Sequence, residues 1–280
     1  MRVGVIGVGR FGAVHARVWA TMPDVDCVGV HDPFPGRAQR VADATGATVF
    51  ADLDGLLANV DAVSIAVPYA RHREIAERAL RGGCHILLEK PFTARAADAL
   101  AIQQIAQERG RVAYAGYIER EVSDVAGLAA TIAARHYESR RFVPELQPGQ
   151  DEILELMVHD FHHALRLFQP SAAAVSATAP SPFRSEVEVR FSPFGSARLT
   201  AGDGGQERVM RFNGDDSATL DLGCATIRAQ NPLRKQFARF LQAIRKTERG
   251  GQDHLAVAVL RLAEAAMLAR ETGETQHVAL

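Results

Sequence analysis

The chain has 280 residues, of which 47% are hydrophobic and 23% are charged, and its formal net charge is −1. This length allows a large core and suggests two domains, while the near-neutral charge disfavours nucleic acid and anionic membranes as partners. No apolar stretch approaches the length of a membrane span. The first strand also begins too early to leave room for a signal peptide, so we expect a cytoplasmic protein.

Apolar runs alternate with helical patterns from residue 2 to about residue 117. The apolar runs predict strands at 3–6, 25–30, 47–50, 61–67, 84–88 and 112–115. Apolar residues at helical spacing predict helices at 11–20, 37–44, 54–58, 71–81 and 93–109. Asp54 and Thr93 are the expected N-caps of the third and fifth helices. Repeated βα units with short connections predict a doubly wound parallel sheet.

The pattern changes near residues 118–121. We expect a helix at 122–133, a partly extended segment at 132–141, a loop at 142–150 and a helix at 151–168. Short alternating segments then predict an antiparallel meander with strands at 173–179, 186–191, 197–201, 207–212 and 218–222. Two helices, at 232–247 and 254–271, precede a last strand at 276–280.

The predicted fold class is therefore α/β, with two domains. A doubly wound domain spans 1–118, and an α+β domain with an open, mostly antiparallel sheet spans 119–280; its final segment can pack back on the first domain. The strand at 186–191 alternates polar and apolar residues, as in a sheet with one buried face. We expect a second subunit to cover that apolar face, in a homodimer or homotetramer.

The three cysteines, Cys27, Cys84 and Cys224, lie far apart in apolar runs. Their spacing fits neither a zinc site nor a disulfide framework, so we expect small buried residues.

The first strand stops at Gly7-Val8-Gly9-Arg10-Phe11-Gly12, which fits the dinucleotide-binding pattern G-x-G-x-x-G. Gly7 permits a tight turn, Gly9 lets the backbone approach a pyrophosphate, and Gly12 lets helix and strand pack closely. The N–H groups at the start of the helix would face the phosphates.

The second predicted strand ends at Asp32, twenty residues past Gly12, where an acid accepts hydrogen bonds from ribose hydroxyls. A carboxylate there repels a 2′-phosphate and favours NAD as the cofactor. Arg37 lies close enough in the sequence to leave NADP as the less favoured choice.

Glu89-Lys90-Pro91 follows the fifth predicted strand. Because ligands bind beyond the carboxyl ends of such strands, we expect Lys90 beside the nicotinamide. Its ammonium group can bond a hydroxyl or carbonyl and stabilise charge that develops during hydride transfer. A solvated lysine at a strand end is the alternative.

The helix predicted at 151–168 carries Glu155, His159, His162 and His163 at three- and four-residue spacing, which places them on one face. Histidine suits proton transfer at neutral pH, and a carboxylate one turn away can orient it. Histidines with only a structural role are one alternative. A zinc site is another, but no cysteine, second carboxylate pair or H-E-x-x-H accompanies them, so we expect no metal.

These motifs resemble the glucose–fructose oxidoreductase/inositol dehydrogenase (Gfo/Idh/MocA) family of sugar and cyclitol dehydrogenases, which join a Rossmann domain to an open-faced sheet domain. The resemblance covers nearly the whole chain. It rests on residues 4–12, Asp61–Pro68 followed by His72, Glu89-Lys90-Pro91, Gly116-Tyr117-x-x-Arg120, Glu155-x-x-x-His159 and Asn231-Pro-Leu-Arg.

The resemblance implies an NAD(P)-dependent oxidoreductase that takes hydride from a secondary alcohol of a sugar, nucleotide sugar or cyclitol. His159 is the implied acid/base, with Lys90 and Glu155 around it, and the bond before Pro91 is implied to be cis. The implied substrate contacts are Lys90, Tyr117, Arg120, His159 and His162. The implied cofactor contacts are Gly7, Gly9, Arg10, Phe11, Gly12, Asp32, Arg37, Val67, Pro68, His72, Glu89 and Lys90.

Two other functions fit the same motifs. One is an NAD(P)H-dependent ketone or imine reductase, and the other is a cofactor-binding regulator without catalysis. The stretch 156–160 looks most like family members that act on nucleotide-linked amino sugars. Arg135, Arg140 or Arg141 could contact a phosphate only if they face the cleft.

The chain departs from the family's pattern at several positions that bear on the substrate and on activity. Glu155 stands where the family has Asp, His162 replaces an acid, and Tyr69 stands where Asn is common. Residues 121–150 also look compressed, and Glu-Val-Ser follows Arg120 where the family has F-N-P.

Overall fold

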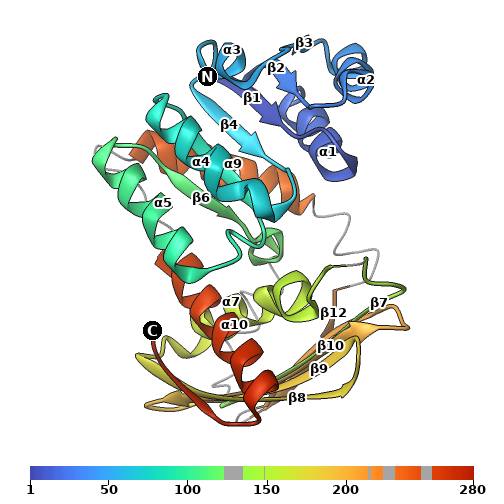
Figure 1. Cartoon of the computed structure of the whole chain (residues 1–280), viewed down its shortest axis with the longest axis vertical. Helices are drawn as coiled ribbons and strands as arrows, with labels where there is room; N and C mark the ends of the chain where they lie inside the picture. Colours follow the sequence, from blue (N-terminus) through green and yellow to red (C-terminus); the bar gives the residue numbers. More distant parts are fainter. Residues whose placement is uncertain (123–134, 148, 214–215, 223–230, 247–253) are drawn as a thin grey trace. The chain divides into compact units, whose positions relative to one another are not determined.

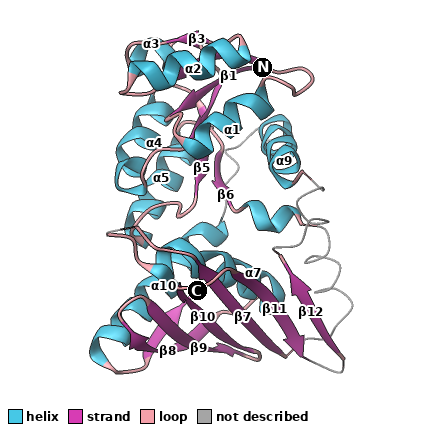
Figure 2. Cartoon of the chain, turned by 90° about the vertical axis from the view of Figure 1, so that its right-hand side faces the viewer, coloured by secondary structure: helices cyan, strands magenta, loops and turns pink. Residues whose placement is uncertain are grey.

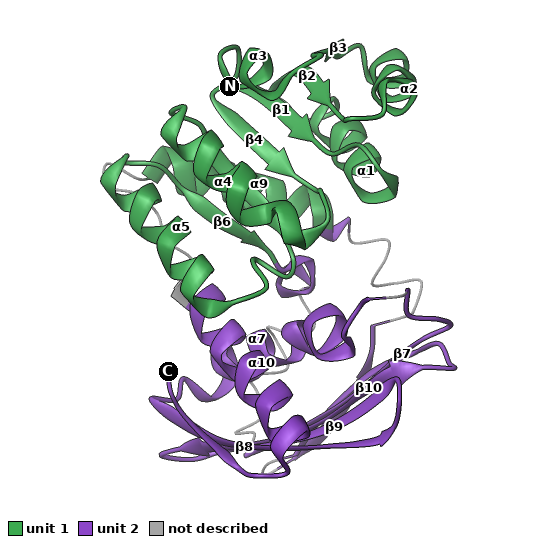
Figure 3. Cartoon of the chain, viewed as in Figure 1, with its two compact units in different colours: residues 1–116, 233–254 green, residues 117–232, 255–280 purple. Residues whose placement is uncertain are grey.

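The computed structural model describes residues 1–122, 135–147, 149–213, 216–222, 231–246 and 254–280 (Figure 1). Helices and strands make up most of this part of the chain (Figure 2). It forms two compact units, Met1–Gly116 with Leu233–His254, and Tyr117–Pro232 with Leu255–Leu280 (Figure 3). The helix expected at 122–133 and Cys224 lie outside the described residues, apart from Val122.

The first unit contains a sheet of six parallel strands in the order β3-β2-β1-β4-β5-β6 (Figure 1). This confirms the doubly wound sheet. The order reverses between β1 and β4, which is where such sheets bind ligands beyond the carboxyl ends of their strands. The strands are β1 (Arg2–Ile6), β2 (Asp26–His31), β3 (Thr48–Val49), β4 (Ala62–Ile65), β5 (His85–Glu89) and β6 (Ala113–Gly116).

Helices cover both faces of this sheet, with α1 and α9 on one side and α4 and α5 on the other (Figure 2). The rings of Trp19 on α1 and Phe237 on α9 stack with centroids 3.9 Å apart, so a helix from late in the sequence completes the core of the first unit. The helices are α1 (Arg10–Trp19), α2 (Pro35–Thr45), α3 (Leu53–Leu57), the 3₁₀ turn η1 (Tyr69–Arg71), α4 (His72–Arg81), α5 (Ala96–Glu108) and α9 (Pro232–Lys246).

Both predicted N-caps in this unit are wrong. The carboxylate of Asp52 accepts a hydrogen bond from the backbone N–H of Gly55 at 2.7 Å and caps α3, while Asp54 lies inside the first turn. Helix α5 begins later than expected, after Arg95, and the Thr93 hydroxyl donates to the Arg95 carbonyl at 2.8 Å. Thr93 therefore stabilises the turn that follows β5 instead of the helix.

The second unit contains a seven-stranded sheet in the order β12-β11-β7-β10-β9-β8-β13. It is mostly antiparallel, as expected, but the simple meander is wrong because β7 lies between β10 and β11 and runs parallel to β10. The strands are β7 (His136–Val143), β8 (Ala172–Ser181), β9 (Arg184–Ser192), β10 (Ser196–Asp203), β11 (Glu207–Asn213), β12 (Ser217–Asp221) and β13 (Gln276–Ala279). The final strand pairs with β8 of this sheet.

Helices α7 (Val158–Phe168) and α10 (His254–Thr272) lie over one face of this sheet (Figure 3). On β9, Val187, Val189 and Phe191 are buried, while Glu188 and Arg190 are exposed. The apolar face is thus covered by helices of the same chain. A second subunit is therefore not needed to cover this face, and the oligomeric state stays a prediction.

Two cysteines belong to the described residues, and both are free thiols. Cys84 is buried and Cys27 is half-buried, and burial raises the pKa of each thiol to about 11. No helix in the described part of the chain is long and apolar enough to cross a membrane.

Candidate active site

The glycine turn after β1 has the geometry that its three glycines predict. Gly7 adopts φ = +79°, in the left-handed region, and a Cβ there would lie 2.6 Å from the Val67 side chain. A Cβ on Gly12 would overlap the carbonyl oxygen of Gly7, so only glycine lets α1 pack this closely on the strand end. A Cβ on Gly9 would meet nothing within 4 Å. Gly9, the N-cap of α1, therefore exposes backbone to open space where a phosphate can approach.

Asp32 directly follows β2, and both of its carboxylate oxygens are anchored. Oδ2 accepts from the backbone N–H of Val8 and Oδ1 from that of Phe34, each at 2.9 Å. Each oxygen retains a lone pair for a ribose hydroxyl. Because the carboxylate is held from two sides, it cannot turn away from a 2′-phosphate. The Arg37 guanidinium lies 4.4 Å from the centroid of the Phe34 ring.

A cavity of about 730 Å³ opens beside these residues in the first unit. Six predicted cofactor residues line it: Gly7, Gly9, Asp32, Arg37, Val67 and Pro68. Sequence reasoning missed another part of the lining, which follows β3 and β4: Ala51, Asp52, Leu53, Arg71, Ile75 and Arg78. Their position after two strand ends is the sequence signal that could have identified them. Arg10, Phe11, Gly12, His72, Glu89 and Lys90 do not line this cavity.

The ring of His72, a predicted cofactor contact, bonds backbone carbonyls. Its Nε2 lies 2.9 Å from the Val67 oxygen and its Nδ1 lies 3.0 Å from the Pro91 oxygen. Burial lowers the pKa of His72, although the carbonyl partners oppose this shift. The histidine therefore links the turn after β4 to the turn after β5, behind the cavity wall.

Lys90 directly follows β5 and is half-buried. The Lys90–Pro91 peptide is cis, as the family resemblance implies. The neighbouring Glu89 side chain points into the protein, and its Oε2 accepts from the backbone N–H of Lys90 at 3.3 Å. Of the three motif residues, Lys90 is the half-buried one, directly beyond the carboxyl end of β5.

In the second unit, the helix expected at 151–168 begins differently from the expectation. Its first part, Ile153–Met157, is a π-helix (η3), and α7 follows from Val158. A π turn contains more residues than an α turn. The four-residue spacing between Glu155 and His159 therefore crosses two helix types, and the common face that we expected for them does not follow from it. His159, His162 and His163 are buried, whereas Glu155 is half-buried.

Tyr117 packs against two of these histidines. Its ring stacks on the His162 ring with centroids 4.6 Å apart, and its centroid lies 6.2 Å from that of His159 in an edge arrangement. Burial, followed by the positive charges of His163 and Arg120, holds the pKa of His162 well below its usual value. His162 is therefore a neutral group at the position where the family has an acid.

A buried polar network that the sequence did not predict supports this cluster. Arg141 on β7 donates from Nε to Asp160 at 2.7 Å, and from Nη1 and Nη2 to Glu119 at 2.7 and 2.6 Å. Tyr137 donates to the other Asp160 oxygen at 2.6 Å. Asp160 is adjacent to His159 in the chain, and Glu119 is two residues from Tyr117. The network thus fixes the backbone that carries both rings.

The charges of this network favour the ionised form of Glu119. Burial is the largest single influence and would raise the pKa of Glu119, but the charges of Arg141 and of the positive form of His159, with the hydrogen bonds of His163 and Arg141, together outweigh it. The pKa of Glu119 is therefore held well below its usual value. His163 lies 3.5 Å from Glu119. With two carboxylates against one guanidinium, the network places negative charge beside His159 and His163, whereas His162 faces positive charges.

The arginines considered for a substrate phosphate have other partners or positions. Arg141 is 3% exposed and bonds Glu119 and Asp160, so the suggestion that it contacts a phosphate is wrong. Arg140 points to the opposite face of its strand and lies 3.3 Å from Glu207. Arg120, a predicted substrate contact, donates to Glu121 at 3.1 Å.

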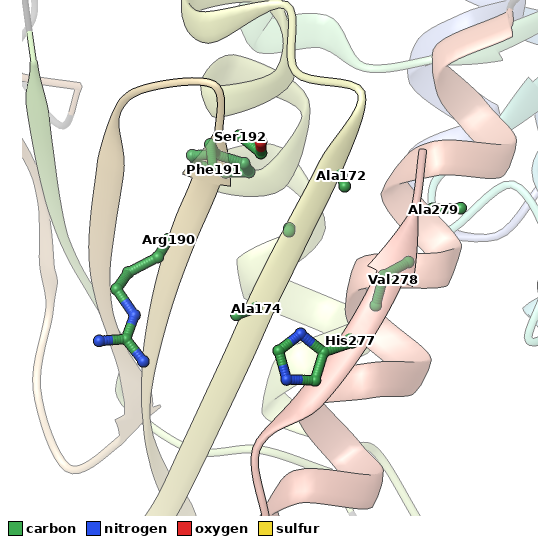
Figure 4. Close-up of a pocket in the computed structure, with 9 residues that line it drawn as sticks. Ala172, Ala174, Arg190, Phe191, Ser192, His277, Val278 and Ala279 are labelled. Atoms are coloured by element: carbon green, nitrogen blue, oxygen red, sulfur yellow. The ribbon is translucent and has the colours of Figure 1, made fainter.

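Two further observations delimit the candidate site. No group of three or more His, Cys, Asp or Glu side chains that could hold a metal ion occurs among the described residues. A second cavity of about 480 Å³ lies among β8, β9 and β13, where Arg190 and His277 flank a floor of alanines (Figure 4). It contains none of the predicted site residues.

Comparison with known proteins places the first 117 residues in a family. The model of the GFO_IDH_MocA family, described as an oxidoreductase family with an NAD-binding Rossmann fold, matches residues 1–117. The UDP-N-acetylglucosamine 3-dehydrogenase of Acidithiobacillus ferrooxidans is 40% identical over 172 residues, which are 60% of this chain and 54% of that enzyme. The inositol 2-dehydrogenase of Rhizobium meliloti is 27% identical over 192 residues, 64% of this chain and 58% of that enzyme. The matches thus span little more than half the length of these curated relatives.

Solved structures extend the likeness to the whole chain. The structure of the Acidithiobacillus ferrooxidans enzyme is 30% identical and superimposes with a TM-score of 0.87 over 97% of this chain and 98% of that one. GenD2 from gentamicin A biosynthesis, solved in complex with NAD, gives a TM-score of 0.90 at 22% identity over 100% of this chain and 97% of that one, which shows the shared fold.

Proposed function

The chain belongs to the Gfo/Idh/MocA family of oxidoreductases with an NAD-binding Rossmann fold, and from that premise we propose that it is an NAD-dependent dehydrogenase. It oxidises a secondary alcohol of a sugar, nucleotide sugar or cyclitol to a ketone. The hydride passes to the nicotinamide and the hydroxyl proton passes to a side chain of the protein.

The observation that carries this proposal is the cavity bounded by Gly7, Gly9 and Asp32 at the carboxyl edge of the parallel sheet. It lies where the strand order reverses, and its walls suit a dinucleotide: open backbone at Gly9 for the pyrophosphate and an anchored carboxylate at Asp32 for ribose hydroxyls. The backbone hydrogen bonds to both Asp32 oxygens support NAD over NADP, because they hold the carboxylate in place and its charge would repel a 2′-phosphate.

We assign the chemical roles to Lys90 and His159. When bound, NAD supplies the hydride acceptor. Lys90 donates a hydrogen bond to the reacting oxygen and stabilises its developing negative charge. His159 accepts the hydroxyl proton, and the negative network around Glu119 stabilises the imidazolium that results. Tyr117 and neutral His162 form a wall of the substrate site, with Arg120 and Glu155 at its edge.

Among the possible substrates we propose a nucleotide-linked amino sugar. The support is the relative named UDP-N-acetylglucosamine 3-dehydrogenase, which is 40% identical over 172 residues and shares the fold along 97% of this chain. The stretch Leu156–Asp160, which includes His159, resembles members of the same kind.

The test is a cofactor and substrate panel. The purified chain is mixed with NAD or NADP and with UDP-N-acetylglucosamine, myo-inositol or glucose, and reduced cofactor is followed by absorbance. We expect turnover with NAD and the nucleotide sugar. Lys90→Met and His159→Asn should each lower kcat by about 10²–10⁴-fold. If Lys90 and His159 act on the same substrate oxygen, kcat of the double variant should fall by a factor far smaller than the product of the two single-variant factors.

Each failure has a distinct meaning. Tight NAD binding without turnover on any member of the panel, in either direction, would favour a regulator over an enzyme. Full activity of Lys90→Met would contradict the assigned role of Lys90 while leaving the dehydrogenase in place.

A further inference from the structure

Buried polar groups on α1, β4 and β5 of the first unit lie in contact next to the Lys90 backbone. His15 on α1 is 0% exposed. Its Nδ1 lies 2.6 Å from the hydroxyl oxygen of Ser64 on β4, and its Nε2 lies 3.2 Å from Oε1 of Glu89 at the end of β5. The same Glu89 carboxylate accepts from the backbone N–H of Lys90 through Oε2 at 3.3 Å. One helix and two strands are thus joined at the residue that precedes Lys90.

The environment of His15 isolates it from water. The ring of Phe11 lies 5.4 Å away by centroids and the ring of Phe237 lies 5.0 Å away. A buried imidazole next to a carboxylate is costly unless each ring nitrogen has a partner. The Ser64 hydroxyl is the hydrogen-bond partner of Nδ1, and the Glu89 carboxylate lies at ion-pair distance from Nε2.

The chemistry of the partners fixes the proton on one nitrogen. An ionised Glu89 can only accept, so the hydrogen of a neutral His15 ring belongs on Nε2, the nitrogen 3.2 Å from Oε1. The neutral ring then accepts at Nδ1 from the Ser64 hydroxyl. The His15–Glu89 distance is that of an ion pair, but the angle falls outside that of a regular hydrogen bond. A small movement of α1 or of the carboxylate would close or open this contact.

Gly116 provides the space that Glu89 occupies. A Cβ at Gly116, the last residue of β6, would lie 2.8 Å from Oε1 of Glu89. The missing side chain is therefore what allows the carboxylate to turn inward toward His15. Two independent features, the histidine and the glycine, hold Glu89 in one orientation.

We propose that His15 is a positioning residue for Lys90. It orients Glu89, and Glu89 fixes the Lys90 backbone at the end of β5. Helix α1 begins at the glycine turn, so the same contact couples the turn that receives the pyrophosphate to the position of Lys90. This inference rests on the proposed function only for its catalytic consequence; the effect on the Lys90 backbone does not depend on it.

The first readout is amide hydrogen exchange of the full chain, which needs no activity. In His15→Leu, exchange at the Lys90 amide should rise at least tenfold, while the amides of Leu87 and Leu88 within β5 stay unchanged. His15→Gln, whose amide can still donate to Glu89, should restore most of the protection. Ser64→Ala frees the His15 ring and should give an intermediate effect with a milder disturbance of folding.

The second readout is kinetic. His15→Leu should lower kcat tenfold or more while KM for the substrate changes less than threefold, and His15→Gln should recover at least half of the loss on a logarithmic scale. The matched control is His85→Asn, at the opposite end of β5. It should alter neither Lys90 exchange nor kcat, even if the protein becomes less stable.

The two proposals fail in different ways. Unchanged Lys90 exchange in both His15→Leu and Ser64→Ala would overturn the positioning role, whatever the enzyme does. Faster exchange in these variants, together with a wild-type chain that shows no turnover, would support the positioning role and count against the proposed dehydrogenase. Equal losses of Lys90 amide protection and of kcat in His15→Leu and His15→Gln would also contradict a role of His15 that acts through Glu89.

Discussion

Arg141 and Glu119 are joined by two parallel hydrogen bonds, Nη1 to Oε1 at 2.7 Å and Nη2 to Oε2 at 2.6 Å. This bidentate pair is buried, and Asp160 completes the coordination of the guanidinium through Nε. It connects the segment after Tyr117 to the helix that carries His159. The second unit therefore builds its part of the candidate site on a charged network and not on apolar packing alone.

Arg141→Met should strongly destabilise the second unit, because it leaves two buried carboxylates without a cation. We expect a loss of about 3–5 kcal/mol in the free energy of unfolding, measured by urea denaturation. Arg140→Met is the control, since this neighbour is exposed and its ion pair with Glu207 contributes about 0–1 kcal/mol. Equal effects of the two substitutions would contradict the network.

Gly9→Ala and Gly12→Ala should separate binding from folding. The added methyl at Gly9 points into open space, so we expect an unchanged melting temperature and NADH binding weakened about tenfold or more, measured by calorimetry. At Gly12 the methyl overlaps the Gly7 carbonyl, so we expect a lower melting temperature. Unweakened NADH binding by Gly9→Ala would show that the pyrophosphate lies elsewhere.

Phe237→Ala should destabilise the first unit and change its fluorescence. Trp19 is the single tryptophan of the chain, it is fully buried, and Phe237 stacks on it at 3.9 Å. Removing the ring should cost about 3–5 kcal/mol and shift the emission of Trp19, followed during urea unfolding. Gln242→Ala, at an exposed position of the same helix, should change neither quantity; a shift there would mean that any change in α9 affects Trp19.

His85 should make stability depend on pH. Burial, followed by the charge of Arg111, lowers its pKa from 6.5 to about 4, and its Nδ1 accepts from the Val112 N–H at 3.0 Å. Between these two pH values the unfolded chain binds a proton that the folded chain excludes, so stability is present above pH 6.5 and is lost as the pH falls toward 4.

The measurement for His85 is the urea midpoint at a series of pH values in that range, for the wild type and His85→Asn. Asparagine can keep the acceptor without the titrating ring. The variant should show a shallower decline in acid. Parallel curves would indicate that other groups cause the acid sensitivity.

The sequence predicted the first unit well because its signals are local. An apolar run, a glycine turn and an acid at the next strand end lie within Arg2–Asp32, and each is required by the geometry of one βα unit. The two errors there, Asp54 and Thr93, are also local. Each had a suitable side chain, but the N-cap lies two residues earlier or later than the sequence pattern indicated, at Asp52 and at Arg95.

The second unit was less predictable because its decisive contacts are distant in sequence. Nothing within β7 shows that it lies between β10 and β11, since that depends on strands more than fifty residues away. On β7 each alternating set mixes polar and apolar residues and contains one arginine, so Arg141 and Arg140 could not be sorted into buried and exposed. The π turn at Ile153–Met157 is likewise not visible in the spacing of Glu155 and His159.

The most direct test of the proposed activity is to follow the hydride itself. The chain is incubated with NAD and UDP-N-acetylglucosamine deuterated at its ring carbons, and the reduced cofactor is analysed by mass spectrometry, with Lys90→Met as the matched control. We predict deuterium in the reduced cofactor from the wild type and a transfer rate at least 100-fold lower from the variant. Bound NAD that acquires no deuterium, or equal transfer by Lys90→Met, would contradict the account.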